Sequence, residues 1–228
     1  MPAHDIAHTV LLALGATEQH GPHLPLATDT LIAGAVAERA ARLLGGTAVA
    51  LPVPVGASSE HREFPGTISL PHEVLAALVA QLCDGLRRSG FRRIAVFSAH
   101  GGNGRALALA AERLGDDVLI LPDFRMAPVL AGLGIDASRA GAHAGLAETS
   151  AVMAINARLV RIDLAEPGYV GALEEIWGVL TTAGLRPVTA NGVLGDPRGA
   201  SPALGELCLE AWVAAVVEAV ARWRNGAE

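Results

Sequence analysis

The chain has 228 residues, of which 51% are hydrophobic and 18% charged, and its formal net charge is −6. A chain this apolar with so small a net charge is not intrinsically disordered, and its acidic balance argues against a broad nucleic-acid-binding surface. Polar or charged residues interrupt every apolar run before about 18 residues, so no membrane-spanning segment is expected.

All 17 basic residues are arginine. The absence of lysine excludes Schiff-base chemistry, covalent attachment of pyridoxal phosphate and the Walker-A phosphate loop. The two cysteines, Cys83 and Cys208, lie far apart within apolar helical patterns, which indicates buried thiols rather than a disulfide or a metal framework. No secretory signal is visible at the N-terminus, so we expect one cytoplasmic domain spanning residues 1–228.

Strand-like and helical segments alternate along the chain. Strands are predicted at Thr9–Leu14, Thr47–Val53, Ile94–Ser98 and Val118–Leu121, with a short strand-like piece at Gly66–Leu70. Helices are predicted at about Asp29–Leu44, capped by Thr28 or Asp29, and at about Pro71–Ser89, Asn103–Leu114, Gly145–Asn156, Ala172–Ala183 and Pro202–Asn225. The Gly-rich stretch after the fourth strand has no clear pattern. The alternation is typical of βαβ units, so we expect an α/β fold with a parallel sheet covered by helices on both faces.

The loops after the first and third strands carry a set of polar side chains. Glu18 and His20 follow the first strand, Asp29 begins the first helix, and His100 follows the third strand. Ligands bind beyond the carboxyl ends of strands in parallel sheets, and carboxylates with imidazoles are typical metal ligands. Taken singly, each residue has an ordinary alternative, with Glu18 or Asp29 as a helix cap and His100 as a buried loop histidine.

A second cluster surrounds the start of the predicted helix at residue 145. His143 directly precedes this helix, and Glu148 falls in its first turn, near the positive end of the helix dipole. The alternative is a simple capping arrangement. A nucleophilic triad fits less well, because the sequence has no GxSxG motif and neither cysteine has a histidine near it in sequence.

Three motifs together resemble the creatininase (creatinine amidohydrolase) family. They are TEQHGPHLP at residues 17–25 followed by Thr28-Asp29, HGGN at 100–103, and HAG with ETS at 143–145 and 148–150. The resemblance runs from about residue 9 to at least residue 160. It implies a three-layer α/β/α fold with a mainly parallel central sheet, a homo-oligomer, and two divalent metal ions that serve amide hydrolysis.

The resemblance also implies roles for individual residues. By position, Glu18 and His100 match ligands of one metal ion, His20 matches a ligand of the other, and Asp29 matches the carboxylate that bridges them. Mixed imidazole and carboxylate ligands suit Zn(II), Fe(II) and Mn(II) alike, so the metal stays open.

One departure from the family pattern follows His100. Creatininase itself has Tyr-Glu there, and that glutamate is a ligand, whereas this chain has Gly101 and Gly102. Another residue must complete the metal site, and Glu148 is the candidate, either as a ligand or as an acid–base group. His143 is expected to polarise the carbonyl or to protonate the leaving amine. The missing glutamate argues against creatinine as the substrate.

A narrower resemblance concerns the substrate. GASSEH at 56–61, FPGTIS at 64–69 and ANGVLGDP at 190–197 are similar to the branch of peptidases that trims the mycofactocin precursor peptide. That branch releases a Val-Tyr-derived unit near the C-terminus for redox cofactor biosynthesis. Glu60, His61 and Asn191 are then expected to bind the peptide, with no nucleic-acid or membrane partner. Two alternatives stay open: a family member that hydrolyses a small formamide or cyclic amide, and a non-catalytic metal-binding scaffold.

Overall fold

A parallel sheet forms the centre of the computed structural model, which describes residues 8–121, 127–132, 134–136 and 141–226. Its described strands are β1 (Thr9–Leu14), β2 (Thr47–Val49), β3 (Arg93–Ser98) and β4 (Val118–Ile120). They lie in the order β2-β1-β3-β4, and each neighbouring pair is parallel. All six residues of β1 are buried, as expected for a parallel strand that is covered on both faces.

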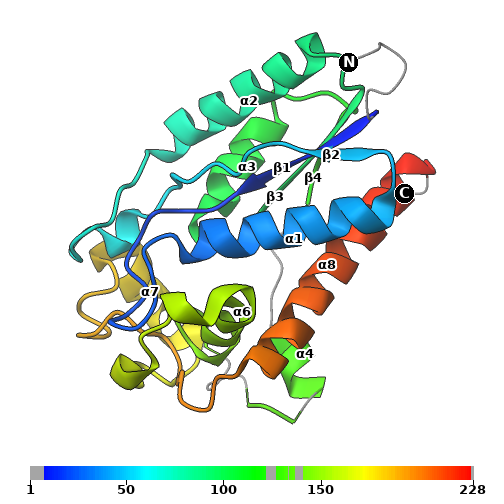
Figure 1. The fold of residues 1–228 in the computed structure, drawn as a ribbon. Helices are drawn as coiled ribbons and strands as arrows, with labels where there is room; N and C mark the ends of the chain where they lie inside the picture. Colours follow the sequence, from blue (N-terminus) through cyan, green and yellow to red (C-terminus); the bar gives the residue numbers. More distant parts are fainter. Residues whose placement is uncertain (1–7, 122–126, 133, 137–140, 227–228) are drawn as a thin grey trace.

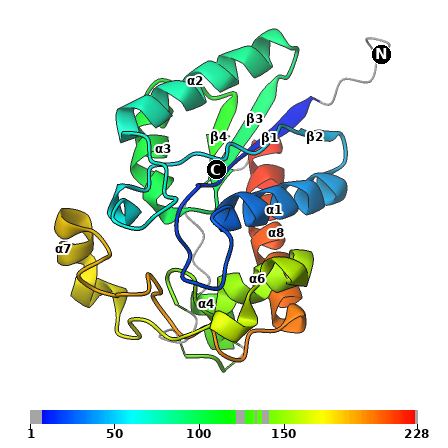
Figure 2. The same cartoon turned by 60° about the vertical axis from the view of Figure 1, so that its left-hand side comes forward.

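Helices cover both faces of this sheet (Figures 1 and 2). On one face lie α2 (His72–Arg88) and α3 (Gly104–Ala111), and on the other lie α1 (Thr28–Leu44), α6 (Leu146–Asn156) and α8 (Pro202–Arg224). The three-layer α/β/α architecture is therefore confirmed. The remaining described helices are η1 (Ser59–His61), η2 (Gly101–Asn103), α4 (Ala127–Gly132), η3 (Ala157–Leu159), η4 (Ile162–Leu164) and α7 (Leu173–Ala183).

The alternation of side chains along β1 explains the two layers of core. Val10 and Leu12 pack with α2 and α3, whereas Leu11 and Ala13 pack with α1 and α8. Successive side chains of a strand point to opposite faces, so a continuous apolar run fills both layers at once. This packing leaves the carboxyl end of β1 as a fixed platform for the residues that follow it.

The structure differs from the sequence prediction in several places. β2 ends at Val49, and Val53 forms only an isolated bridge with Leu14. The piece at 66–70 likewise forms isolated bridges, one of them between Thr17 and Ile68. α4 lies in the stretch that had no predicted element, part of which falls outside the described residues.

The predicted cap of α1 is wrong. The helix is preceded by Ala27 as its cap residue, without a side-chain hydrogen bond. Thr28 donates its hydroxyl to the carbonyl of Pro25 instead, at 2.7 Å. Asp29 turns its carboxylate to His20, with 3.1 Å between Oδ1 and Nε2. Because the Asp29 carboxylate contacts a buried imidazole instead of capping the helix, we assign it to the site.

Two predictions from composition can be compared directly with the structure. Cys83 and Cys208 are free and buried, as the apolar patterns around them predicted. Across the residues that are described, no helix combines the length and the apolarity needed to cross a membrane.

Candidate metal centre and active site

Buried polar side chains gather at the carboxyl ends of β1 and β3, the edge at which parallel sheets bind ligands. Glu18 and His20 follow β1, Asp29 faces back from the first turn of α1, and His100 follows β3. Each of the four residues is 6% exposed or less. Charged and polar groups are almost never so fully buried unless they are paired or bind a metal, so this cluster calls for a chemical explanation.

The ligand atoms fall into three overlapping groups, and within each group they lie within 4.8 Å of one another. The groups are Glu18–Asp29–His100, His20–Asp29–Glu148 and Glu18–His20–His143. Asp29 belongs to the first two, as a bridging carboxylate must, and Glu148 completes the second. The structure thus brings together all five residues that the sequence predicted as ligands, and their binding of metal stays a prediction.

Hydrogen bonding leaves oxygens of two of these carboxylates unsatisfied. Both oxygens of Glu18 and Oδ2 of Asp29 are buried without a hydrogen-bond partner among the described residues. An ionised carboxylate held out of water in this way is strongly destabilising unless a cation or a donor compensates it. The donor set therefore fits divalent metal ions, whose charge would compensate these oxygens.

His20 and His100 are oriented by backbone carbonyls. His20 Nδ1 lies 3.1 Å from the carbonyl oxygen of Glu18, and His100 Nε2 lies 3.0 Å from that of Ala57. A carbonyl oxygen only accepts, so these two nitrogens carry hydrogen. The other nitrogens, His20 Nε2 and His100 Nδ1, face Asp29 Oδ1 at 3.1 Å and Oδ2 at 3.6 Å. A proton or a metal ion must lie between each such pair, and metal-binding histidines commonly donate their other N–H in this way.

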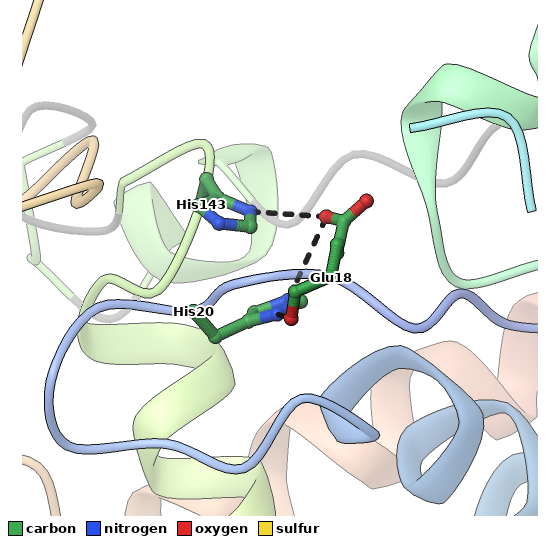
Figure 3. Close-up of side chains that lie close together, drawn as sticks. All are labelled: Glu18, His20 and His143. Atoms are coloured by element: carbon green, nitrogen blue, oxygen red, sulfur yellow. Dashed lines mark hydrogen bonds and ion pairs between the residues drawn. The ribbon is translucent and has the colours of Figure 1, made fainter. Parts of the chain in front are cut away.

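His143 follows the same rule (Figure 3). Its Nε2 donates to the carbonyl oxygen of Gln19 at 2.7 Å, and its Nδ1 lies 3.6 Å from Glu18 Oε1. The ring centroid of His143 is 4.2 Å from that of His20. Burial, followed by the neighbouring His20 and His61, holds the pKa of His143 well below its usual range. A neutral imidazole with a bare nitrogen aimed at the carboxylate can serve as a ligand or as a base.

The electrostatics of the cluster favour a cation. Burial alone would lower the pKa of His20, but Asp29, Glu148 and Glu18 outweigh it and raise that pKa to about 10. The same competition, led on the raising side by Glu18, holds the pKa of His100 well above its usual range. Burial would raise the pKa of Glu18, but the imidazoles, led by His100, hold it well below the usual range. Without metal, protons on the imidazoles supply the positive charge that a metal ion supplies when bound.

Glu148 reaches the cluster from the first turn of α6. Its Oε2 accepts the backbone N–H of Ala144 at 2.6 Å and lies 3.9 Å from His20 Nε2. Ala144 is buried with a φ of 52°, a conformation that is uncommon for a residue other than glycine. Burial raises the pKa of Glu148 to about 7, although His20 opposes it. The carboxylate therefore bonds to the backbone at the helix start and faces the metal cluster at the same time.

The 3₁₀ turn η1 brings two further residues to the site. His61 Nε2 lies 3.4 Å from Glu18 Oε1, and Glu60 Oε1 lies 3.7 Å from His100 Nε2 and 3.8 Å from His61 Nε2. Burial raises the pKa of Glu60 and lowers the pKa of His61 to about 4. A Cβ at Gly102 would lie 2.7 Å from Glu60 Oε1 and would overlap His100 Nε2. It would also overlap the backbone carbonyl of Ala57, so the glycine at position 102 leaves room for Glu60, for His100 and for that backbone.

Asn191, predicted to bind substrate, is engaged in its own loop. Its Oδ1 accepts the backbone N–H of Val193 at 3.1 Å, and its Nδ2 donates to the carbonyl of Pro167 at 3.1 Å. These bonds hold the loop that carries Gly192 against the site. Contact between Asn191 and a peptide stays a prediction.

Gln19 is a central residue that the sequence did not single out. Its side-chain nitrogen lies 2.8 Å from His61 Nδ1 and 3.1 Å from the carbonyl oxygen of Gly192. The available signal was its place between Glu18 and His20, where an extended chain turns it to the opposite side from both. The sequence does not show that the loop carrying Gly192, far away along the chain, contacts the Gln19 side chain.

Known proteins resemble this chain over nearly its whole length. The creatininase family model, described as creatinine amidohydrolase, matches residues 3–220. A mycofactocin precursor peptide peptidase of Mycolicibacterium smegmatis is 37% identical, over 98% of this chain and 90% of its own. The solved structure named Creatininase Mn is 26% identical with a TM-score of 0.77, over 94% of this chain and 90% of its own. The solved structure of a mutant creatininase of Zn-Zn type is 26% identical with a TM-score of 0.72, and it likewise covers 94% of this chain and 90% of its own.

Proposed function

Because this chain belongs to the creatininase family, whose members include amide and peptide hydrolases, we propose that it is a metal-dependent peptidase acting on the mycofactocin precursor peptide. It cleaves the modified peptide near its C-terminus and releases a Val-Tyr-derived unit for redox cofactor biosynthesis. The observation that carries this assignment is the relationship to the Mycolicibacterium smegmatis peptidase over nearly the full length of both chains.

The buried cluster suits a pair of divalent ions, either Zn(II), Mn(II) or Fe(II). Glu18, Asp29 and His100 would hold one ion, and His20, Asp29 and Glu148 would hold the other, with Asp29 between them. The unpartnered oxygens of Glu18 and Asp29 support this arrangement. When bound, such a pair supplies Lewis-acid activation of water and of the substrate carbonyl near neutral pH.

The chain's own residues then handle orientation and protons. If Glu148 is not a ligand of the second ion, its carboxylate is placed to take a proton from the attacking water and to deliver one to the leaving amine. His143 is neutral, and its Nε2–H donates to the backbone carbonyl of Gln19, which leaves Nδ1 bare. His143 can therefore assist as a ligand or as a base. Glu60 and His61 border the cluster on the side of η1, and we propose that they bind the peptide there.

A cavity beside His100 supports a substrate with apolar side chains. It has a volume of about 260 Å³, and most of its wall is aliphatic, contributed by Leu107, Ala108, Ile120 and Leu121. An aliphatic wall beside His100 supports the binding of an apolar side chain of the peptide next to the cluster.

The setting of the enzyme is proposed on separate grounds. Free, buried cysteines are consistent with a reducing compartment such as the cytoplasm. The resemblance to creatininase favours a homo-oligomer, and the exposed apolar side chains of Trp177 and Val179 on α7, at 57% and 43% exposure, are candidates for the interface. Size-exclusion chromatography with light scattering measures the number of copies.

The test is digestion of the modified precursor peptide by the purified enzyme loaded with zinc, manganese or Fe(II). Mass spectrometry should show loss of the intact peptide and release of the C-terminal fragment. The protein incubated with a chelator is the matched control. An intact peptide with every metal, together with turnover of a small formamide or cyclic amide, would overturn the peptidase assignment in favour of a small-amide hydrolase.

A further inference from the structure

The side-chain amide of Gln19 has a single possible orientation. Its Oε1 lies 2.9 Å from the backbone nitrogen of Gly21, which can only donate. Its Nε2 lies 3.1 Å from the carbonyl oxygen of Gly192, which can only accept. Exchanging the oxygen and the nitrogen would break both contacts. Gly192 has a φ of 79° and passes so close that a Cβ there would overlap the amide, so the loop holds the amide in place.

This orientation decides the protonation of His61. One N–H of the amide goes to Gly192, and the other is directed at His61 Nδ1, 2.8 Å away. His143 Nε2 also lies 3.2 Å from the amide nitrogen, but it already donates its hydrogen to the Gln19 carbonyl at 2.7 Å. His61 Nδ1 is therefore the bare nitrogen, and the hydrogen of the neutral ring is on Nε2.

His61 differs from its three neighbours in where its N–H is directed. In His20, His100 and His143 an N–H donates to a backbone carbonyl, and Nε2 of His100 also lies 3.3 Å from Glu18 Oε2. In His61 the N–H is directed at the carboxylates. That N–H faces Glu18 Oε1 at 3.4 Å, beyond the usual range of about 2.7–3.2 Å for an N–H···O hydrogen bond. A group of this kind cannot bind a metal through its inward nitrogen, but it can donate to an oxygen placed in the site.

We infer that His61 is a catalytic hydrogen-bond donor whose Nε2–H binds the carbonyl oxygen of the scissile amide, and that Gln19 is the positioning residue that sets this tautomer. The role rests on the proposed amide hydrolysis. As water adds to the carbonyl carbon, negative charge develops on that oxygen, and a preformed donor stabilises it. His61 keeps its proton throughout, and the proton that the leaving amine needs comes from another group.

Two substitutions of His61 separate this role from its alternatives. Glutamine keeps an N–H donor about where Nε2 lies but cannot exchange protons at neutral pH, and leucine keeps bulk without a donor. We expect His61→Leu to lose about 10²–10³ in kcat, the usual cost of one such donor, and His61→Gln to lose no more than about tenfold. Zinc content should be unchanged in both. Equal losses in the two variants, or a loss of zinc, would overturn the assignment.

The tautomer itself can be observed without substrate. Long-range ¹H–¹⁵N NMR of the zinc-loaded protein distinguishes protonated from bare ring nitrogens. We expect a bare Nδ1 in His61 and a bare Nδ1 in His143. In Gln19→Met, His61 should lose its single tautomer while His143 keeps its own, because the backbone carbonyl of residue 19 remains. A wild-type His61 protonated at Nδ1, or an unchanged His61 in Gln19→Met, would contradict the inference.

Failure of the proposed function is distinguishable from failure of this inference. The NMR and zinc measurements do not depend on the substrate. If the wild-type enzyme cleaves a small amide and not the peptide, the two His61 variants are compared on that amide, and the same ratio of kcat values is expected.

Discussion

Replacing Asp29 by alanine should damage both metal sites at once. Its Oδ1 lies 3.1 Å from His20 Nε2 and its Oδ2 lies 3.6 Å from His100 Nδ1, so each oxygen faces a different ligand group. Loss of a residue that only supports a ligand costs about 10–100-fold in metal affinity, so loss of a shared ligand should cost at least that at each site. At about 1.4 kcal/mol per tenfold, the summed binding free energy falls by roughly 3–6 kcal/mol or more.

The measurement is equilibrium dialysis against buffered free zinc, followed by elemental analysis of zinc per chain, with circular dichroism to check the fold. Glu148→Ala is the matched control, because Glu148 belongs to only one of the two groups that share Asp29. We expect two zinc ions in the wild type, weakened binding at both sites in Asp29→Ala, and one unaffected site in Glu148→Ala. Two unaffected sites in Asp29→Ala, or one, would refute the bridging role.

Four further outcomes are expected. In the metal-free protein, the raised pKa of His20, about 10 against an ordinary 6.5, means that the folded state binds more protons at this residue. The contribution of His20 to stability is therefore complete below pH 6.5 and is lost as pH rises toward 10. Between pH 7 and 10 the loss should approach about 4 kcal/mol in urea unfolding, and the zinc-loaded protein, in which the metal replaces that proton, should not show it. Gly102→Ala should lower stability by about 1–3 kcal/mol through overpacking, whereas Gly104→Ala, whose Cβ would meet nothing within 4 Å, should not. Equal effects would show that crowding at position 102 is not the cause. Glu148→Gln should reduce kcat by roughly 10²–10⁴ in single-turnover assays if the carboxylate transfers protons. Near-normal turnover would show that Glu148 serves only to accept the hydrogen bond from the backbone of Ala144. Creatinine should not be a useful substrate, and turnover comparable with that of a peptide would contradict the significance given to Gly102.

The fold was largely predictable because its elements are locally encoded. β1 is a continuous apolar run that ends at a glycine, and α8 begins at Pro202 after Ser201, whose hydroxyl caps the helix. Such signals act within a few residues and survive tertiary packing. β2 was predicted too long because its last residues bridge the sheet only once, at Val53, and the pattern of apolar residues does not report pairing.

The sequence predicted the carboxylates and imidazoles that gather at the site, but it predicted neither Gln19 nor the chemistry of the cluster. The spacing of Glu18, His20 and Asp29 indicated a metal cluster, whereas the capping role considered for Asp29 was wrong, because a buried imidazole attracts the carboxylate more strongly than the helix terminus does. The role of Gln19 depends on Gly192, which lies 173 residues away in sequence. Which nitrogen of each histidine carries hydrogen depends on backbone carbonyls, and no pattern of side chains encodes their positions.

The shared space of Gly102 and Glu60 has a consequence for how such enzymes diverge. A larger residue at position 102 would collide with the Glu60 carboxylate and with the ring of His100, while loss of Glu60 alone would leave that corner of the site without a negative charge. A Cβ at position 102 would also overlap the backbone carbonyl of Ala57, so a carboxylate can move from one loop to the other only if this backbone and the ring of His100 shift as well. Exchange of the two arrangements therefore requires coordinated changes at several positions, the backbone included, and no single substitution accomplishes it.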